Sequence, residues 1–169
     1  SQGEIYGEDA VQTWLAELRE EAQLPRLRLV FFAGEPLSEA LVTAWRERCA
    51  GAAQVVNLYG PTETTLAKFC YVVPAEPTAG VQPVGSPLPQ TQALVLGGGG
   101  TLCGIGEPGE IVIRTPLRSL GYINAPDEQQ RRFVANPFGG DARDVVYFTG
   151  DRGRYGLDGI ADALIQSGM

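Results

Sequence analysis

The sequence contains no histidine, and this absence excludes several kinds of chemistry at once. Without an imidazole there is no histidine general acid or base, no Ser–His nucleophile and no histidine metal site. Cysteines Cys49, Cys70 and Cys103 lie far apart, without the paired spacing of a zinc site or a disulfide framework. Three free thiols are typical of a reducing cytosol, so a cytoplasmic location is expected.

Long apolar runs and basic clusters are lacking too. No stretch approaches the ~20 apolar residues that cross a bilayer, and no signal-peptide pattern opens the chain. The arginines are scattered, Lys68 is the only lysine, and the net charge of −7 argues against nucleic acid as the main partner. What remains is a chain of 169 residues with 44% hydrophobic content, which is enough for a globular domain with a sizeable core.

The first half of the chain alternates between helical and strand patterns. Residues 10–22 have helical spacing, with Asp9 as the expected N-cap and an apolar face made of Val11, Trp14, Leu15 and Leu18. Residues 28–32 and 53–58 are predicted to be buried strands. Between them, Ser38 is predicted to cap a helix that ends near Cys49 and turns Leu41, Val42 and Trp45 inward. A strand–helix–strand unit of this kind favours a parallel strand pair.

The second half, after about Pro74, is denser in proline and glycine, and its elements are shorter. Strands are predicted at 92–96, 110–114 and 145–148, a turn at 97–100 and a helix at 127–134. The expected fold class is therefore α/β. Part of a parallel or mixed sheet with flanking helices is followed by a β-rich, distorted barrel-like subdomain. The division expected is 1–74, 85–159 and a tail at 160–169.

The most informative segment is Asn-Leu-Tyr-Gly-Pro-Thr-Glu-Thr-Thr at residues 57–65, directly after a predicted strand. Ligand sites of α/β folds gather at the carboxyl ends of strands. Gly60 and Pro61 fix the backbone there and leave room for a ligand. A carboxylate beside threonine hydroxyls suits a hard cation such as Mg²⁺ carried by a nucleotide.

This segment resembles the fifth core motif of the adenylation domains of nonribosomal peptide synthetases, which are acyl-adenylate-forming enzymes of the acyl-CoA synthetase and luciferase superfamily. Four other segments resemble further parts of that family in the same order: residues 27–37, 84–92, 109–122 (the sixth motif) and 147–151 (the seventh). Together they cover roughly residues 27–159.

The resemblance implies a nucleotide site for ATP. Glu63 would bind Mg²⁺, and Thr62 would bond the developing phosphoryl oxygens, so that the metal neutralises charge as a carboxylate attacks the α-phosphate. Tyr59 would stack on adenine, with Asn57 and the neighbouring backbone at Gly60 meeting the base edge. In the seventh motif, Asp151 would accept hydrogen bonds from the two ribose hydroxyls. Solvated turn carboxylates and a packing aromatic are the plainer interpretations.

The resemblance also implies an acyl pocket next to Gly34, lined by Phe31, Ala33, Leu58, Leu66 and Ala67. These linings are apolar and indicate an uncharged aliphatic or aromatic side chain on the substrate, although ordinary core packing would use the same residues. Residues 121–138 are expected to be structural. Lys68 is a poor candidate for the family's catalytic lysine, which belongs to the tenth motif in a separate subdomain.

The family's phosphate loop, hinge and catalytic lysine have no match here, so the chain is expected to be part of an adenylation domain and inactive alone. The parent would convert an amino, keto or hydroxy acid and ATP into acyl-AMP and pyrophosphate. It would then load the acyl group onto the phosphopantetheine thiol of a carrier protein.

Expected partners are the rest of the adenylation domain, the carrier protein and neighbouring synthetase domains. A non-catalytic adenylation-like module and an acyl-CoA or aryl-acid ligase fragment are the alternatives. Exposed apolar surface should make the isolated chain aggregate, dimerise or have low stability.

Overall fold

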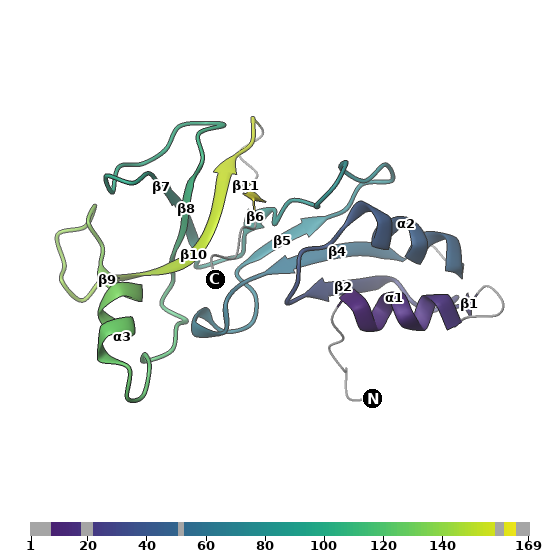
Figure 1. Cartoon of the computed structure of the whole chain (residues 1–169), viewed down its shortest axis with the longest axis horizontal. Helices are drawn as coiled ribbons and strands as arrows, with labels where there is room; N and C mark the ends of the chain where they lie inside the picture. Colours follow the sequence, from purple (N-terminus) through teal and green to yellow (C-terminus); the bar gives the residue numbers. More distant parts are fainter. Residues whose placement is uncertain (1–7, 18–21, 51–52, 158–160, 165–169) are drawn as a thin grey trace.

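The computed structural model describes residues 8–17, 22–50, 53–157 and 161–164. Two main sheets lie next to each other, and α1 and α2 lie against the first of them (Figure 1). The three helices described are α1 (Glu8–Glu17), α2 (Glu39–Arg48) and α3 (Pro126–Arg132). Within the described residues, none of these helices has the length and apolar character needed to span a membrane.

The first sheet has the strand order β2-β4-β5-β6. Its strands are β2 (Leu29–Ala33), β4 (Gln54–Tyr59), β5 (Phe69–Val72) and β6 (Ser86–Pro87). Strands β2 and β4 are parallel and α2 connects them, which confirms the predicted strand–helix–strand unit. Strand β5, which pairs antiparallel with β4, has no counterpart in the sequence-based prediction. A separate parallel ladder joins the short strands β1 (Ala22–Gln23) and β3 (Cys49–Ala50).

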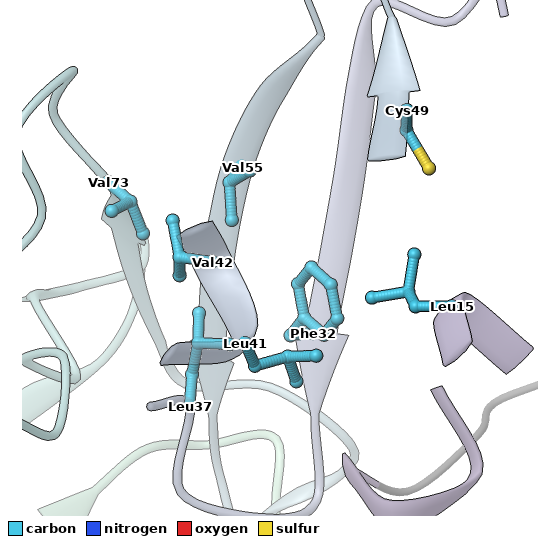
Figure 2. Close-up of a cluster of buried hydrophobic side chains, with 8 residues drawn as sticks. All are labelled: Leu15, Phe32, Leu37, Leu41, Val42, Cys49, Val55 and Val73. Atoms are coloured by element: carbon cyan, nitrogen blue, oxygen red, sulfur yellow. The ribbon is translucent and has the colours of Figure 1, made fainter. Parts of the chain in front are cut away.

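Helix α2 begins where the sequence predicts. The Ser38 side chain accepts a hydrogen bond of 3.1 Å from the backbone N–H of Leu41, as an N-cap should. Leu41 and Val42 are fully buried, and they pack with Phe32 and Val55 of the sheet in the cluster drawn in Figure 2. This cluster joins α1 and α2 to one face of the first sheet.

Helix α1 differs from the prediction at its start. It begins at Glu8, so the predicted N-cap Asp9 lies inside the helix. Leu15 is buried as expected, but Trp14 is 43% exposed, and its ring lies 6.0 Å (between centroids) from that of Trp45, which packs against the cluster. The predicted core position Leu18 lies outside the described residues.

The second sheet is antiparallel, with the order β11-β10-β8-β7 and β9 paired to β10. Its strands are β7 (Gln92–Leu96), β8 (Gly109–Arg114), β9 (Phe133–Ala135), β10 (Val145–Tyr155) and β11 (Ala161–Leu164). The first two match the prediction. The helix predicted at 127–134 stops at Arg132, because Phe133 and Val134, residues that favour strands, pair with β10. The described strands form an open sheet and no closed barrel, with β7 at one edge and β9 and β11 at the other.

Strand β10 is longer than predicted. The sequence indicated a strand at 145–148 followed by a turn, whereas β10 continues to Tyr155. The turn-forming residues instead produce an irregularity, because the register with β8 shifts between Phe148 and Arg152. Gly150 has φ +81°, a left-handed conformation that glycine adopts without steric cost. Asp151 therefore projects from a bulge inside a strand.

A buried seam joins the two sheets. Phe69 and Val84 from the first part of the chain pack with Ile111 and Ile113 of β8, and all four side chains are almost fully buried. The α/β fold class, with a mixed sheet, flanking helices and a β-rich second part, is confirmed. The residue limits of the three predicted segments remain a prediction.

Candidate functional site

A cavity of about 340 Å³ lies where the carboxyl ends of β2 and β4 approach the bulge of β10. Six of the residues predicted to bind nucleotide or substrate line it: Gly34, Asn57, Leu58, Tyr59, Gly60 and Asp151. The remaining lining is contributed by Glu35, Pro36, Pro61, Val81, Gln82 and Val84. The fold thus brings a residue from position 151 to the turn at 57–61.

Tyr59 and Asp151 are in direct contact inside this cavity. The Tyr59 hydroxyl donates a 2.5 Å hydrogen bond to Asp151 Oδ2, across 92 residues of sequence. Burial, followed by this hydrogen bond, raises the pKa of Tyr59 well above its usual value, so the hydroxyl stays protonated. The backbone N–H of Asp151 donates to Thr149 Oγ1 at 3.0 Å, which fixes the bulge.

Asn57 and Gly60 shape the wall of the cavity. Asn57 is only 4% exposed, and its side-chain amide donates to the carbonyl of Pro83 at 2.8 Å. A Cβ on Gly60 would lie 2.7 Å from the backbone nitrogen of Lys68, closer than real side chains come. The approach is tight because the Lys68 N–H donates to the carbonyl of Tyr59 at 2.8 Å and closes the loop that follows β4. Gly60 is therefore required by packing.

Thr62 and Glu63 lie in that loop, within the short 3₁₀ helix η1 (Thr62–Thr64). Thr62 is exposed. The carboxylate of Glu63 accepts a 2.5 Å hydrogen bond at Oε1 from the hydroxyl of Tyr122. Burial raises the pKa of Glu63, but hydrogen bonds from Tyr122, its own backbone N–H and Tyr147, together with the charge of Arg132, outweigh burial and lower it overall. Glu63 is thus held in its charged form.

The contact with Tyr122 is a feature that the sequence did not reveal. Residues 121–138 were expected to be structural, yet Tyr122 reaches Glu63 across 59 residues of sequence. Its hydroxyl also lies 3.1 Å from that of Tyr147 on β10. The only sequence signal was the place of Tyr122 in the segment that resembles the sixth motif.

The residues predicted to line an acyl pocket do not gather in one cavity of the described chain. Gly34 and Leu58 line the cavity near Tyr59, and Ala33 is the register partner of Leu58. Phe31 and Leu66 are instead 55% and 66% exposed, while Ala67 is half-buried. Leu66 has φ +54° in the loop after η1, an uncommon conformation for a non-glycine residue.

Lys68 is 5% exposed. Its ammonium group donates to Thr65 Oγ1 at 3.2 Å, and burial lowers its pKa. None of the ion pairs measured among the described residues includes it. Through its hydrogen bond to Thr65, the side chain contacts the segment that directly follows Glu63.

The described residues contain no group of three or more His, Cys, Asp or Glu side chains that could hold a metal ion. Glu63 is a single charged carboxylate beside threonine hydroxyls. Such a donor set fits a hard cation whose other ligands come from phosphates and water, as Mg²⁺ usually does. It does not fit a metal held by the protein alone.

A larger hollow of about 610 Å³ lies elsewhere, along β7, β8 and the start of β10. None of the residues predicted for the site lines it. Two of its arginines already have partners, since Arg114 pairs with Asp144 at 2.8 Å and Arg143 with Asp141 at 3.0 Å. The smaller cavity is therefore the better candidate, despite its size.

Comparisons with known proteins show the family of this chain. The family described as "AMP-binding enzyme" matches residues 9–123, more than half of the chain. The dimodular nonribosomal peptide synthase of Bacillus subtilis is 35% identical over 152 residues, which cover 89% of this chain and 6% of that protein. Gramicidin S synthase 1 of Brevibacillus brevis is 33% identical over 138 residues, covering 82% and 12%.

A similar fold is found in the crystal structure of the nonribosomal peptide synthetase FmoA3. The TM-score is 0.82 with 25% identity, over 95% of this chain and 17% of that one, and one of its structures is an AMPPNP-bound form. The chain thus spans only a small fraction of the multidomain synthetases it matches. On these similarities, the chain belongs to the AMP-binding enzyme family and is part of an adenylation domain of the nonribosomal peptide synthetase type.

Proposed function

We propose that this chain supplies the nucleotide-binding part of a domain that activates a carboxylic acid with ATP. The products would be an acyl-AMP and pyrophosphate. The observation that carries this proposal is the contact between Tyr59 and Asp151 in one cavity, next to the loop of Glu63. The AMPPNP-bound form of the similar synthetase FmoA3 supports the choice of nucleotide.

In the proposed complex, adenine stacks on the ring of Tyr59, and Asn57 and the backbone at Gly60 meet the edge of the base. Asp151 accepts hydrogen bonds from the ribose hydroxyls, which suits a carboxylate with two acceptor oxygens. The hydrogen bond from Tyr59 orients that carboxylate before the nucleotide arrives. A preorganised site of this kind binds with a smaller entropic cost.

The phosphates lie beside η1 in this proposal. Glu63 holds the Mg²⁺ that accompanies ATP, and Thr62 donates to a phosphoryl oxygen. When bound, the cation neutralises the charge that develops on the phosphate oxygens. Glu63 is suited to this role because its carboxylate is kept charged by neighbouring hydrogen bonds.

The acyl side of the site is proposed to include Gly34, Phe31, Ala33, Leu58, Leu66 and Ala67. The exposure of Phe31 and Leu66 agrees with a pocket that needs further parts of the parent protein to close it. We further propose that the parent transfers the acyl group to the phosphopantetheine thiol of a carrier protein. The chain alone would then lack activity, and residues 1–74 and 85–159 would be successive parts of the adenylation core, followed by a tail at 160–169.

ATP–pyrophosphate exchange by the intact parent protein tests the proposal, scanned over amino, keto and hydroxy acids. Replacing Glu63 by Gln should slow exchange at least ~10²-fold, because the charge that holds the cation is lost. Glu76→Gln, which removes an exposed carboxylate from a loop, is the matched control and should leave exchange unchanged. An unchanged rate in Glu63→Gln would contradict the role assigned to Glu63, whereas no exchange by the unaltered parent with any acid would favour a non-catalytic module. Transfer to free coenzyme A in place of a carrier protein would favour an acyl-CoA ligase.

A further inference from the structure

Tyr122 connects the two sheets through its hydrogen bond to the Glu63 carboxylate of the candidate site. Glu63 belongs to the loop after β4 of the first sheet, whereas Tyr122 belongs to the segment between β8 and α3. Their 2.5 Å contact is a hydrogen bond from a phenol to a carboxylate, and bonds to charged acceptors are stronger than neutral ones. The bond therefore ties the orientation of Glu63 to the position of the second sheet.

The position of Tyr122 is itself fixed on several sides. Its ring meets Phe133 edge-on with centroids 5.7 Å apart, and Phe133 in turn packs on Tyr147 at 5.0 Å. The backbone N–H of Tyr122 donates to Gln129 Oε1 at 2.9 Å. At the preceding residue, Gly121, a Cβ would overlap the same oxygen, and the φ of +129° is one that favours glycine.

Tyr147 contacts both Tyr122 and Phe133. It is 3% exposed, and it is the strand partner of both Phe133 and Ile113. Its hydroxyl lies 3.1 Å from that of Tyr122. A buried hydroxyl in this place limits the rotation of the Tyr122 phenol.

We infer that Tyr122, supported by Tyr147, is a positioning residue that holds the Glu63 carboxylate in the orientation needed for the nucleotide-bound cation. This inference rests on the proposed function and deepens it. A carboxylate offers about four lone-pair sites on two oxygens, so the hydrogen bond from Tyr122 at Oε1, together with the weaker one from Tyr147, restricts its rotation and leaves capacity for a cation. Groups that orient a metal ligand in this way typically change metal affinity about 10–100-fold when they are removed.

The test measures nucleotide binding without turnover. AMPPNP is titrated by calorimetry into the intact parent protein with and without Mg²⁺, and the gain in affinity due to Mg²⁺ is the readout. In Tyr122→Phe this gain should fall about tenfold, while the affinity without Mg²⁺ stays unchanged. Tyr155→Phe removes the hydroxyl of another tyrosine, which donates to the carbonyl of Ala93 away from the site, and should behave as wild type.

Two results would overturn the inference. An undiminished Mg²⁺ gain in Tyr122→Phe would show that the hydroxyl does not act on the cation site. An equal loss of AMPPNP affinity with and without Mg²⁺ would show a general packing role.

The variant Glu63→Gln separates this failure from failure of the proposed function. If Glu63→Gln abolishes the Mg²⁺ gain and Tyr122→Phe does not, only the positioning role is wrong. If Glu63→Gln keeps the gain, the metal assignment itself is wrong. Adding Tyr122→Phe to Glu63→Gln should have no further effect.

Discussion

The two sheets of this chain differ in how completely their strands are covered. In the first sheet, α1 and α2 cover one face, where Phe32 is 8% exposed, but the opposite face leaves Phe31 55% exposed. In the second sheet, β8 is buried on both faces. Ile111 and Ile113 face the seam, and Val112 packs with Leu96 and Val146.

This difference separates strands that are buried by other described residues of the chain from strands that leave apolar side chains exposed. Strand β8 is covered by neighbouring residues of the chain, so the contacts that stabilise it all come from the described residues. The outer face of β2 instead exposes the apolar side chains of Leu29 and Phe31. Exposed apolar patches on a sheet are typical of interaction surfaces. The candidate site lies between the two regions and depends on both.

The largest expected effect is at the seam. Phe69 is fully buried between the sheets, so Phe69→Ala should leave a cavity and lower the free energy of unfolding by about 3–5 kcal/mol. Urea denaturation followed by circular dichroism measures this loss. A loss below about 1 kcal/mol would mean that the sheets do not depend on the seam, and the comparison between them would then concern two independent units.

A smaller effect is expected in the second region, at Asp144. Hydrogen bonds from Arg114 and then Asn136 lower the pKa of this carboxyl. Because the folded pKa lies below the unfolded value of about 3.9, the ionised group stabilises the fold above that value, and this stabilisation is lost as the pH falls through the folded pKa. The melting temperature of Asp144→Asn should therefore lie below that of the parent chain at about pH 6–7 by a small amount.

The same pair of proteins gives the control. Their difference in melting temperature should shrink below about pH 4 and vanish at lower pH, where Asp144 is protonated in both states. A difference that grows on acidification would contradict the lowered pKa.

The smallest effect on stability is expected at Phe31. Phe31→Ser on the exposed face should change the free energy of unfolding by no more than about 0.5 kcal/mol. It should also reduce self-association of the chain in light scattering, because an exposed aromatic ring is removed. The adjacent Phe32→Ser is the matched variant and should destabilise strongly, since Phe32 belongs to the buried cluster. Equal effects of the two changes would mean that both faces of β2 are covered.

Local sequence signals predicted much of the first sheet. Ser38 caps α2 because its hydroxyl meets a nearby backbone N–H, an interaction over three residues that is visible in the sequence itself. The turn after β4 was evident from Gly60 and Pro61 in the same way. The bulge in β10 was not, because Gly150 signals a turn whether the chain reverses or only shifts its register.

The site was predictable only in part, for a related reason. Residues 57–63 are neighbours in sequence, and Asp151 could be added to them from the resemblance to the seventh motif. The hydrogen bond from Tyr122 to Glu63 depends on how one sheet is placed against the other. A tyrosine next to glycine carries no local signal of such a contact, so the three-dimensional structure was needed to find it.

The buried position of Lys68 has a practical consequence. Because it is the only lysine of the sequence, a lysine-directed acylating reagent has one side-chain target, and that target is shielded. Its rate of modification would measure how often the loop of residues 60–68 opens. Since this loop carries Glu63 and adjoins the cavity, a bound nucleotide should slow the labelling. The rate at which Lys68 is acylated would thus report the opening of this loop, with and without nucleotide.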